Sequence, residues 1–167
     1  MSAMPQAGAP RLQPMRVQHL DAVATIEAAA YPFPWSRGNF VDSLAAGYWA
    51  EVLLDERAQV LGYYVAMPVV DELHLLNITV APALHGQGHG RRLLDRVVQQ
   101  ARATQAVALW LEVRESNQRA REIYQRYGFV QVGRRPAYYP APGGREDALL
   151  MSLLLGAPGE GTSHGVD

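Results

Sequence analysis

Residues 73–101 read LHLLNITVAPALHGQGHGRRLLDRVVQQA. The first eight are mostly apolar and include β-branched residues, which predicts a strand at 73–80. HGQGHG (85–90) then places a glycine at every second position, and beyond it Leu94, Val97, Val98 and Ala101 repeat at the i, i+3, i+4, i+7 spacing of an amphipathic helix. The stretch therefore predicts a strand, a glycine loop and a helix in succession.

The glycine loop has the outline of an anion-binding site. Glycines beside a helix start let the backbone approach a ligand and aim free N–H groups at it, next to the positive end of the helix dipole. The spacing Gly86-x-Gly88-x-Gly90 fits neither the dinucleotide fingerprint G-x-G-x-x-G nor the Walker loop, whose lysine this chain lacks. A helix start that simply tolerates glycine is the structural alternative.

Two further details favour a long anionic ligand. Arg91 and Arg92 fall in the first helical turn, where a cation opposes the dipole unless an anion is bound there. Strict alternation along the strand would place Leu76, Ile78 and Val80 on one face as an apolar wall. Coenzyme A, with a pyrophosphate at one end and an amide-containing arm at the other, suits both features.

The remaining sequence predicts a single mixed α/β domain at residues 11–155. The hydrophobic period switches between helix-like and strand-like values, and no linker marks a second domain. The polar or glycine-rich ends, 1–10 and 156–167, are expected to be a disordered N-terminal tail and a flexible C-terminal tail. We predict helices at 19–30, at 36–46 and over the stripe from Ala120 to Tyr127, and strands at 48–54, 59–65, 107–113, 129–133 and 148–155, the first two forming an antiparallel hairpin.

Composition excludes several kinds of chemistry. The 167-residue chain has no cysteine, and all fifteen of its basic side chains other than histidine are arginine. A disulfide framework, a thiolate nucleophile and a Schiff-base lysine are therefore excluded. The histidines predict no metal site, since glycines deny His85 and His89 a shared helical face. A net charge of −1 argues against nucleic acid or a membrane as partner. Because the sequence shows no signal peptide, we expect a cytoplasmic protein, and we favour a monomer.

Two side chains are candidates for proton transfer. Glu112 lies near the C-terminal end of a predicted strand, where it is either a general base or the ion-pair partner of Arg114 on the same face. Tyr124 lies on the apolar stripe of the following helix, as a core residue or as an acid. Asn117 is the simplest N-cap for that helix, with Ser116 as the competing choice.

Together these segments resemble the GCN5-related N-acetyltransferase (GNAT) superfamily and, more narrowly, the RimI-type ribosomal-protein N-terminal alanine acetyltransferases. The strand, glycine loop and helix, followed by LWLEVRESN (109–117), carry the superfamily resemblance. The narrower likeness rests on FPWS (33–36), YYP (138–140) and GREDA (144–148). The resemblance covers nearly all of the chain except the two tails, and it implies the GNAT fold, a mixed sheet of about seven strands flanked by about four helices. His85 departs from the glutamine or arginine that usually opens the loop.

The resemblance also implies acetyl-CoA as co-substrate and assigns roles by position. Glu112 is implied as general base and Tyr124 as general acid. The residues implied for acetyl-CoA binding are Ile78, Thr79, Val80, Gly86, Gln87, Gly88, His89, Gly90, Arg91 and Asn117. The residues implied for the peptide substrate are Trp35, Tyr138, Tyr139, Glu146 and Asp147, of which the last four form a lip unless the segment is only a solvated hairpin loop.

The implied reaction is acetylation of the N-terminal alanine of a small-subunit ribosomal protein, by direct attack of the amine in a ternary complex. An α-amine of pKa near 8 costs about 1.4 kcal/mol to deprotonate at pH 7, against about 4.6 kcal/mol for a lysine amine, which favours protein N-termini. Broader protein N-termini or a small-molecule amine are alternatives among enzymes. The alternative that is not an enzyme is a module that senses coenzyme A without turnover.

Overall fold

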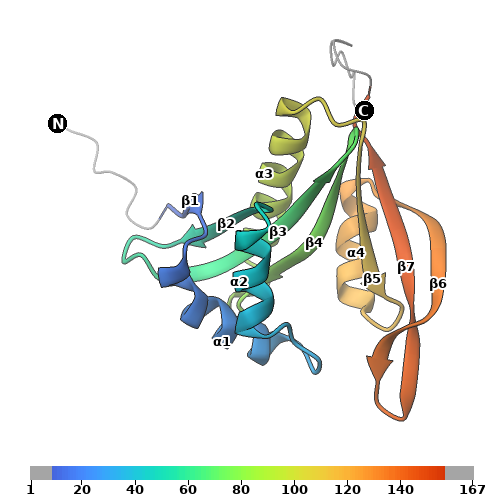
Figure 1. The fold of residues 1–167 in the computed structure, drawn as a ribbon, viewed down its shortest axis with the longest axis horizontal. Coiled ribbons are helices and arrows are strands. Elements are labelled where there is room, and N and C mark those ends of the chain that lie inside the picture. The colour runs from blue at the N-terminus through green and yellow to red at the C-terminus, as the bar shows by residue number, and fades with distance from the viewer. Residues whose placement is uncertain (1–8, 157–167) are drawn as a thin grey trace.

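The computed structural model describes residues 9–156, and the tails predicted at both ends fall almost wholly outside this range. In these residues one seven-stranded sheet runs in the order β1-β2-β3-β4-β5-β7-β6, with four α-helices and two short 3₁₀ turns (Figure 1). The expected α/β domain, with a mixed sheet of seven strands flanked by four helices, is confirmed. The elements are β1 (Arg11–Pro14), α1 (Leu20–Ala30), α2 (Arg37–Ala45), β2 (Trp49–Leu54), β3 (Val60–Val69), β4 (Glu72–Val80), α3 (His89–Ala103), β5 (Ala108–Arg114), α4 (Gln118–Tyr127), β6 (Val130–Ala141) and β7 (Gly144–Leu154).

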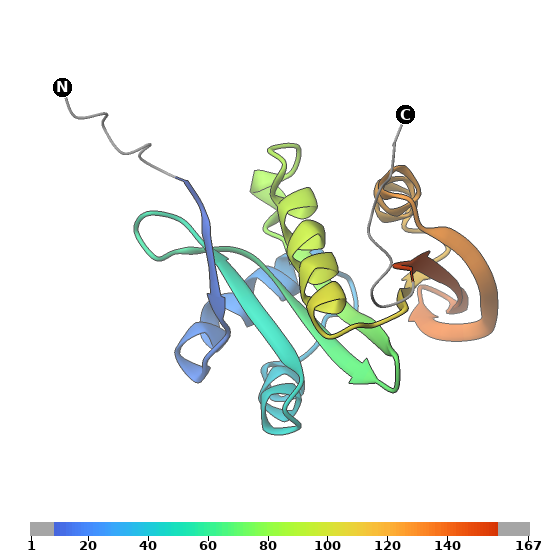
Figure 2. The ribbon, with the colours of Figure 1, turned by 90° about the horizontal axis from the view of Figure 1, so that it is seen from above.

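Helices cover both faces of the sheet. On β2, Leu53 joins a core cluster with α3, whereas its neighbours Val52 and Leu54 join a second cluster with α1 and α2. Because successive strand residues point to opposite faces, α1 and α2 lie on one face and α3 on the other. Figure 2 shows this arrangement from above. Gly62 of β3 permits close packing, since a Cβ there would lie 2.6 Å from the Thr79 carbonyl oxygen.

The sheet opens between β4 and β5. These strands pair in parallel from Glu72 with Ala108 to Leu75 with Leu111, and the pairing stops there. Beyond that point β4 stays with β3, and β5 continues beside β7. The two strands therefore separate at the centre of the sheet (Figure 1).

A β-bulge at Leu76 adds to this opening. On β3, Val65 pairs with Asn77 and Ala66 with Leu75, which leaves Leu76 unpaired. The expectation that Leu76 continues one apolar face with Ile78 is wrong, because a bulge breaks the period of two and shifts the facing side chains. Leu76 is instead a partly exposed side chain beside the opening.

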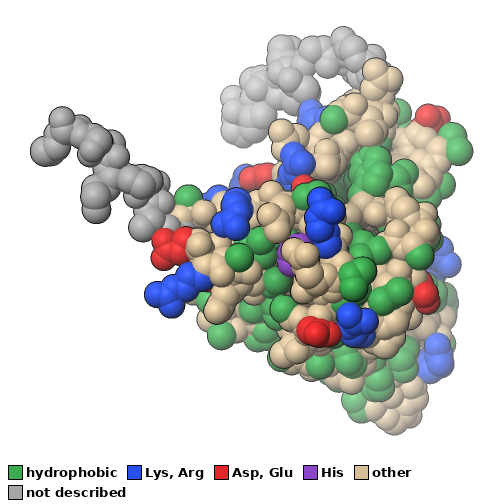
Figure 3. Space-filling view, turned by 60° about the vertical axis from the view of Figure 1, so that its left-hand side comes forward, with side chains coloured by type: hydrophobic (Ala, Val, Ile, Leu, Met, Phe, Trp, Pro, Cys, Tyr) green, Lys and Arg blue, Asp and Glu red, His purple; other side chains and the backbone are tan. Residues whose placement is uncertain are grey.

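The last two strands are longer than the sequence pattern predicts. β6 and β7 form an antiparallel hairpin whose outer part is the segment from Tyr138 to Asp147. The pairing skips residues between Arg135 and Tyr139, and Ala137 has a positive φ of 51° in this irregular stretch. On the face shown in Figure 3, arginines and acidic side chains are interspersed. No helix within residues 9–156 is long and apolar enough to span a membrane.

Candidate active site

A cavity of about 320 Å³ lies where β4 and β5 separate. Its walls come from both strands, from α1 and the segment after it, from α4 and from the end of β6. Six residues predicted for catalysis or for binding acetyl-CoA or the peptide line it: Trp35, Ile78, Glu112, Asn117, Tyr124 and Tyr139. The glycine loop lies outside this lining, at the start of α3.

Glu112 projects from β5 on the face opposite the α3 cluster, which takes Leu111 and Val113 from the same strand. Its side chain is 20% exposed, and its Oε1 lies 3.5 Å from Nε of Arg135 on β6. The alternative pairing with Arg114 is wrong, because that guanidinium turns to Glu146, with 3.0 Å between Nη1 and Oε1. Glu112 thus reaches the cavity with the Arg135 guanidinium beside it.

Tyr124 faces the cavity from α4, with its ring 5.6 Å from that of Phe129. Burial raises the pKa of its hydroxyl, and the nearby phenols of Tyr31 and Tyr139 add to the increase. A hydroxyl that keeps its proton in this way is a hydrogen-bond donor at neutral pH. The tyrosine therefore combines a core position with access to the reaction cavity.

The loop before α3 has the geometry of an anion cradle. Gly86 and Gly88 have φ values of +82° and +84°, a region that favours glycine. Within the described residues, the backbone N–H groups from Gly86 to Arg91 donate to no backbone carbonyl. His85 turns back instead, with its Nε2 3.1 Å from the Val80 carbonyl oxygen. These N–H groups lie at the positive end of a fifteen-residue helix.

Three further residues predicted to bind acetyl-CoA, namely Asn117, Thr79 and Arg91, have partners within the protein. Asn117 is the N-cap of α4, with its Oδ1 3.2 Å from the Ala120 nitrogen, so the competing choice of Ser116 is wrong. The Thr79 side chain is buried on the α1 side, where its Oγ1 lies 2.8 Å from the Tyr31 hydroxyl. The Arg91 guanidinium lies 5.5 Å from the centre of the Tyr127 ring.

The predicted acidic pair of the lip has structural partners. Glu146 accepts from the Ser116 N–H at 3.1 Å as well as from Arg114, and hydrogen bonds from these two residues lower its pKa. Asp147 accepts from the Ala137 N–H at 2.9 Å and from Arg134 at 2.8 Å, and these bonds lower its pKa too. Neither carboxylate lines the cavity, and both hold the outer hairpin in place.

Of the two tyrosines of the lip, Tyr139 lines the cavity and Tyr138 does not. The Arg114 guanidinium lies 4.5 Å from the centre of the Tyr139 ring and 5.3 Å from that of Phe33, which joins the β6–β7 hairpin to the segment after α1. Tyr138 packs edge-on against Tyr139 at 4.9 Å. Burial and the neighbouring charge of Glu112 raise the pKa of Tyr138.

A second carboxylate, Glu27, lies in the cavity wall and was not predicted from the sequence. Glu27 of α1 is 2% exposed and accepts from the Tyr63 hydroxyl at 2.7 Å, from Asn77 Nδ2 at 3.0 Å and from the Trp35 N–H at 3.0 Å. All three donors are neutral. The sequence feature that could have revealed Glu27 was its position on the helix. Leu20, Val23 and Glu27 are the buried residues of α1, and an acid on such a stripe needs hydrogen-bond partners.

Residues 20–129 match the Acetyltransferase (GNAT) family. The chain belongs to this family. Its cavity at the strand opening and its N–H cradle before α3 thus lie in an acetyltransferase domain.

Relatives of this GNAT chain extend the match beyond the family level. It is 40% identical over 131 residues to the [ribosomal protein bS18]-alanine N-acetyltransferase of Haemophilus influenzae, covering 78% of this chain and 88% of the relative. The protein of the same name from Haemophilus ducreyi is 36% identical over 139 residues, covering 83% and 95%. The crystal structure of the ribosomal-protein-S18-alanine N-acetyltransferase from Escherichia coli superposes with a TM-score of 0.83 at 33% identity, covering 93% of this chain and all of the other.

Proposed function

We propose that this GNAT acetyltransferase transfers an acetyl group from acetyl-CoA to the N-terminal alanine of ribosomal protein bS18. The observation that carries the proposal is the relation to enzymes of that name, at 36–40% identity over about four fifths of the chain. The cavity supports it, because Glu112 and Tyr124 both line it and can accept and donate a proton.

The residues present fit acetyl-CoA. The unpaired N–H groups from Gly86 to Arg91 suit the pyrophosphate, because they converge at a helix N-terminus where negative charge is favoured. Beyond Leu75, β4 has no strand partner on the β5 side, which leaves a strand edge for the amides of the pantetheine arm, and Ile78 and Asn117 both line the cavity there. When bound, acetyl-CoA supplies the acetyl group as a thioester. Arginine provides every nearby cation other than histidine, since the chain has no lysine.

Glu112 and Tyr124 divide the proton transfers between them. Glu112, directly or through water, takes the proton that the substrate ammonium must lose before its nitrogen can attack. The nitrogen forms a bond to the acetyl carbon, the carbon–sulfur bond breaks, and Tyr124 gives its proton to the departing thiolate. The acylated nitrogen then loses its second proton, which restores the Tyr124 hydroxyl and leaves a neutral amide. With no cysteine in the chain, a thiol acyl-enzyme is excluded and direct transfer is the simpler route.

The choice of an α-amine agrees with the acid–base arithmetic of this site. A protein N-terminus has a pKa near 8, so about a tenth of it is already neutral at pH 7, whereas a lysine amine is neutral in far less than about a thousandth. The α-ammonium is the stronger acid of the two, so it gives up its proton more readily to a carboxylate such as Glu112. We place this reaction in the cytoplasm, with bS18 as the peptide partner.

A peptide panel tests the proposal. Acetyl-CoA is offered with peptides that differ only in their first residue, and the acetyl group is located by mass spectrometry. We expect acetylation of the α-amine with a preference for alanine. Equal acetylation of many first residues would support a broad N-terminal enzyme instead. No acetylation of any peptide, combined with tight coenzyme A binding, would leave a coenzyme A-sensing module.

A further inference from the structure

A chain of side-chain hydrogen bonds runs through the wall of the reaction cavity, from Glu27 to Tyr31. Asn77 donates from its Nδ2 to Glu27 at 3.0 Å and accepts with its Oδ1 from the Thr79 hydroxyl at 2.7 Å. The Thr79 oxygen lies 2.8 Å from the oxygen of the Tyr31 hydroxyl. Because Tyr31 lines the same cavity as Glu112, the chain ends at a phenol beside the site of the reaction.

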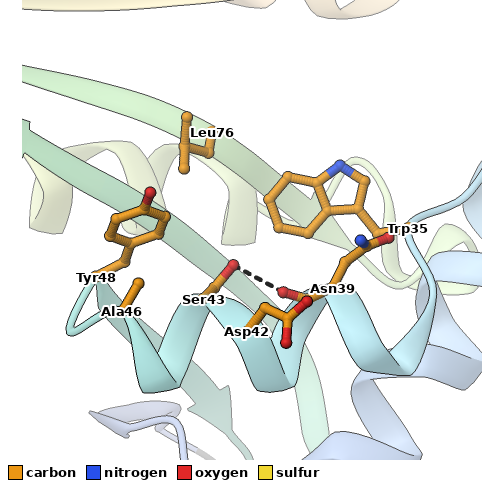
Figure 4. A pocket seen from close by; sticks show the side chains of 7 residues that line it. All are labelled: Trp35, Asn39, Asp42, Ser43, Ala46, Tyr48 and Leu76. Atoms are coloured by element: carbon orange, nitrogen blue, oxygen red, sulfur yellow. Dashed lines mark hydrogen bonds between the residues drawn. The ribbon is translucent and has the colours of Figure 1, made fainter.

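The Glu27 end of this chain is held from several sides. Its carboxylate also accepts from the Tyr63 hydroxyl and from the Trp35 N–H. Trp35 lines the reaction cavity and also a second cavity, of about 440 Å³, on the α2 side. Figure 4 shows its ring above α2 in this second cavity. Donors from β3, from β4 and from the segment after α1 therefore give the chain of hydrogen bonds a fixed origin.

The direction of the last hydrogen bond follows from the number of hydrogens. Asn77 presents its amide nitrogen to Glu27, so its oxygen faces Thr79, which must give its one hydroxyl hydrogen to that oxygen. Tyr31 is then the donor to Thr79, with the Ile78 carbonyl oxygen at 3.3 Å as its only other acceptor within residues 9–156. Burial raises the pKa of Tyr31 to about 12, so the hydroxyl keeps its hydrogen at neutral pH. This hydrogen is directed at β4 in either case, and the Tyr31 oxygen can offer a further ligand only a lone pair.

A reacting amine needs more than one acceptor in this cavity. An α-ammonium carries three N–H donors, and Glu112 takes one of its hydrogens in the proposed reaction. Asn117 Oδ1 already accepts from the Ala120 N–H at 3.2 Å, and Tyr124 is required as a donor to the thiolate. Tyr31 differs from both, because its oxygen is committed to accepting, which suits an N–H group of the substrate.

We propose that the Tyr31 hydroxyl oxygen accepts a hydrogen bond from the reacting amine and thereby orients its nitrogen for the transfer. The proposal rests on the proposed function and assigns a third side chain to that reaction, besides Glu112 and Tyr124. One N–H directed at Glu112 leaves the amine free to rotate about its bond to carbon, whereas a second one held by Tyr31 restricts that rotation. Orientation of this kind lowers the entropic part of the barrier.

The test compares two peptides that differ only at the amine. One begins with alanine, and the other carries a propionyl group in its place and so lacks the nitrogen. Dissociation constants are measured by calorimetry on enzyme saturated with coenzyme A, which has no acetyl group to transfer. Tyr31→Phe should weaken binding of the alanine peptide about tenfold, as loss of a hydrogen bond to a charged group would, and leave the affinity for the propionyl peptide unchanged.

Tyr64→Phe is the matched control. It removes a buried hydroxyl that donates to Glu51 at 2.5 Å on the α3 side of the sheet, away from the cavity. We expect it to change the affinity for neither peptide. In Tyr31→Phe the ring remains and Thr79 keeps its bond to Asn77, so we expect a folded protein, which urea unfolding verifies.

The possible outcomes separate this inference from the proposed function. Equal weakening of both peptides in Tyr31→Phe would show that the tyrosine only shapes the cavity, and it would overturn the inference alone. Unchanged affinity for the alanine peptide would do the same. Acetylation of the alanine peptide by the wild type, with acetyl-CoA in place of coenzyme A, tests the proposed function separately. Its absence would overturn that function and the role of Tyr31 with it.

Discussion

Glu27→Gln separates the role of the second carboxylate from that of the core around it. Glutamine keeps the side-chain length, and its carbonyl oxygen can still accept from Tyr63 and Asn77, but its amide NH₂ then faces the Trp35 N–H. A buried donor left without an acceptor costs about 1–3 kcal/mol, and removal of a buried charge offsets part of this. We therefore expect a loss of stability of about 2 kcal/mol or less. Release of Trp35, which lines both cavities, should raise the KM for an alanine-initiated peptide about tenfold, the effect of about 1.4 kcal/mol of lost binding.

Tyr63→Phe is the matched control for this variant. It removes a different donor to the same carboxylate, costs about 1.5–3 kcal/mol as a lost bond to a charged group, and leaves the Trp35 contact in place. Urea unfolding gives the stability of both variants, and steady-state rates give kcat and KM. We expect Tyr63→Phe to lose stability at unchanged KM. An equal rise of KM in both variants would show that any loosening of this core has the same effect, and an unchanged KM in Glu27→Gln would refute the anchoring of Trp35.

Three further predictions concern the catalytic pair, the loop and the tyrosines. Glu112→Gln should lower kcat at least about a hundredfold at unchanged coenzyme A affinity. Tyr124→Phe should lower kcat without lowering the melting temperature. Wild-type turnover in either variant would remove that residue from the mechanism. Gly88→Ala meets no atom within 4 Å, so we expect only about 1 kcal/mol of backbone strain, together with weaker coenzyme A binding by calorimetry; unchanged affinity would argue against the cradle. Burial raises the pKa of Tyr31 to about 12, so the folded state holds a proton that the unfolded chain releases near pH 10. Stability is then complete below about pH 10 and is lost as pH rises toward 12, and urea midpoints should show this fall in the wild type and a smaller one in Tyr31→Phe.

The central elements could be predicted because local pattern and tertiary structure agree there. The apolar stripe of α3 and the alternation along β5 appear in the structure as buried faces, and Gly128, which directly follows the stripe of α4 in the sequence, is the C-cap of that helix. The four residues of β1 were missed, since a short edge strand of mixed composition has no clear period. The bulge at Leu76 was also missed, because it depends on pairing with β3 and no local sequence signal encodes that register.

The two cavity carboxylates show why the site was only partly predictable. Glu112 could be found because it interrupts an alternating strand near its end and belongs to the run that resembles the family. Glu27 lies among alanines on a helix, and its donors come from β3, β4 and the segment after α1, which only the fold brings together. Their surroundings also differ in a way that suits different tasks. Glu112 is partly exposed in the cavity wall with one arginine 3.5 Å away, which leaves it within reach of a substrate amine or a water molecule. Glu27 is fully enclosed by three neutral donors that hold its carboxylate in one position, which is the property required of an anchor rather than of a base.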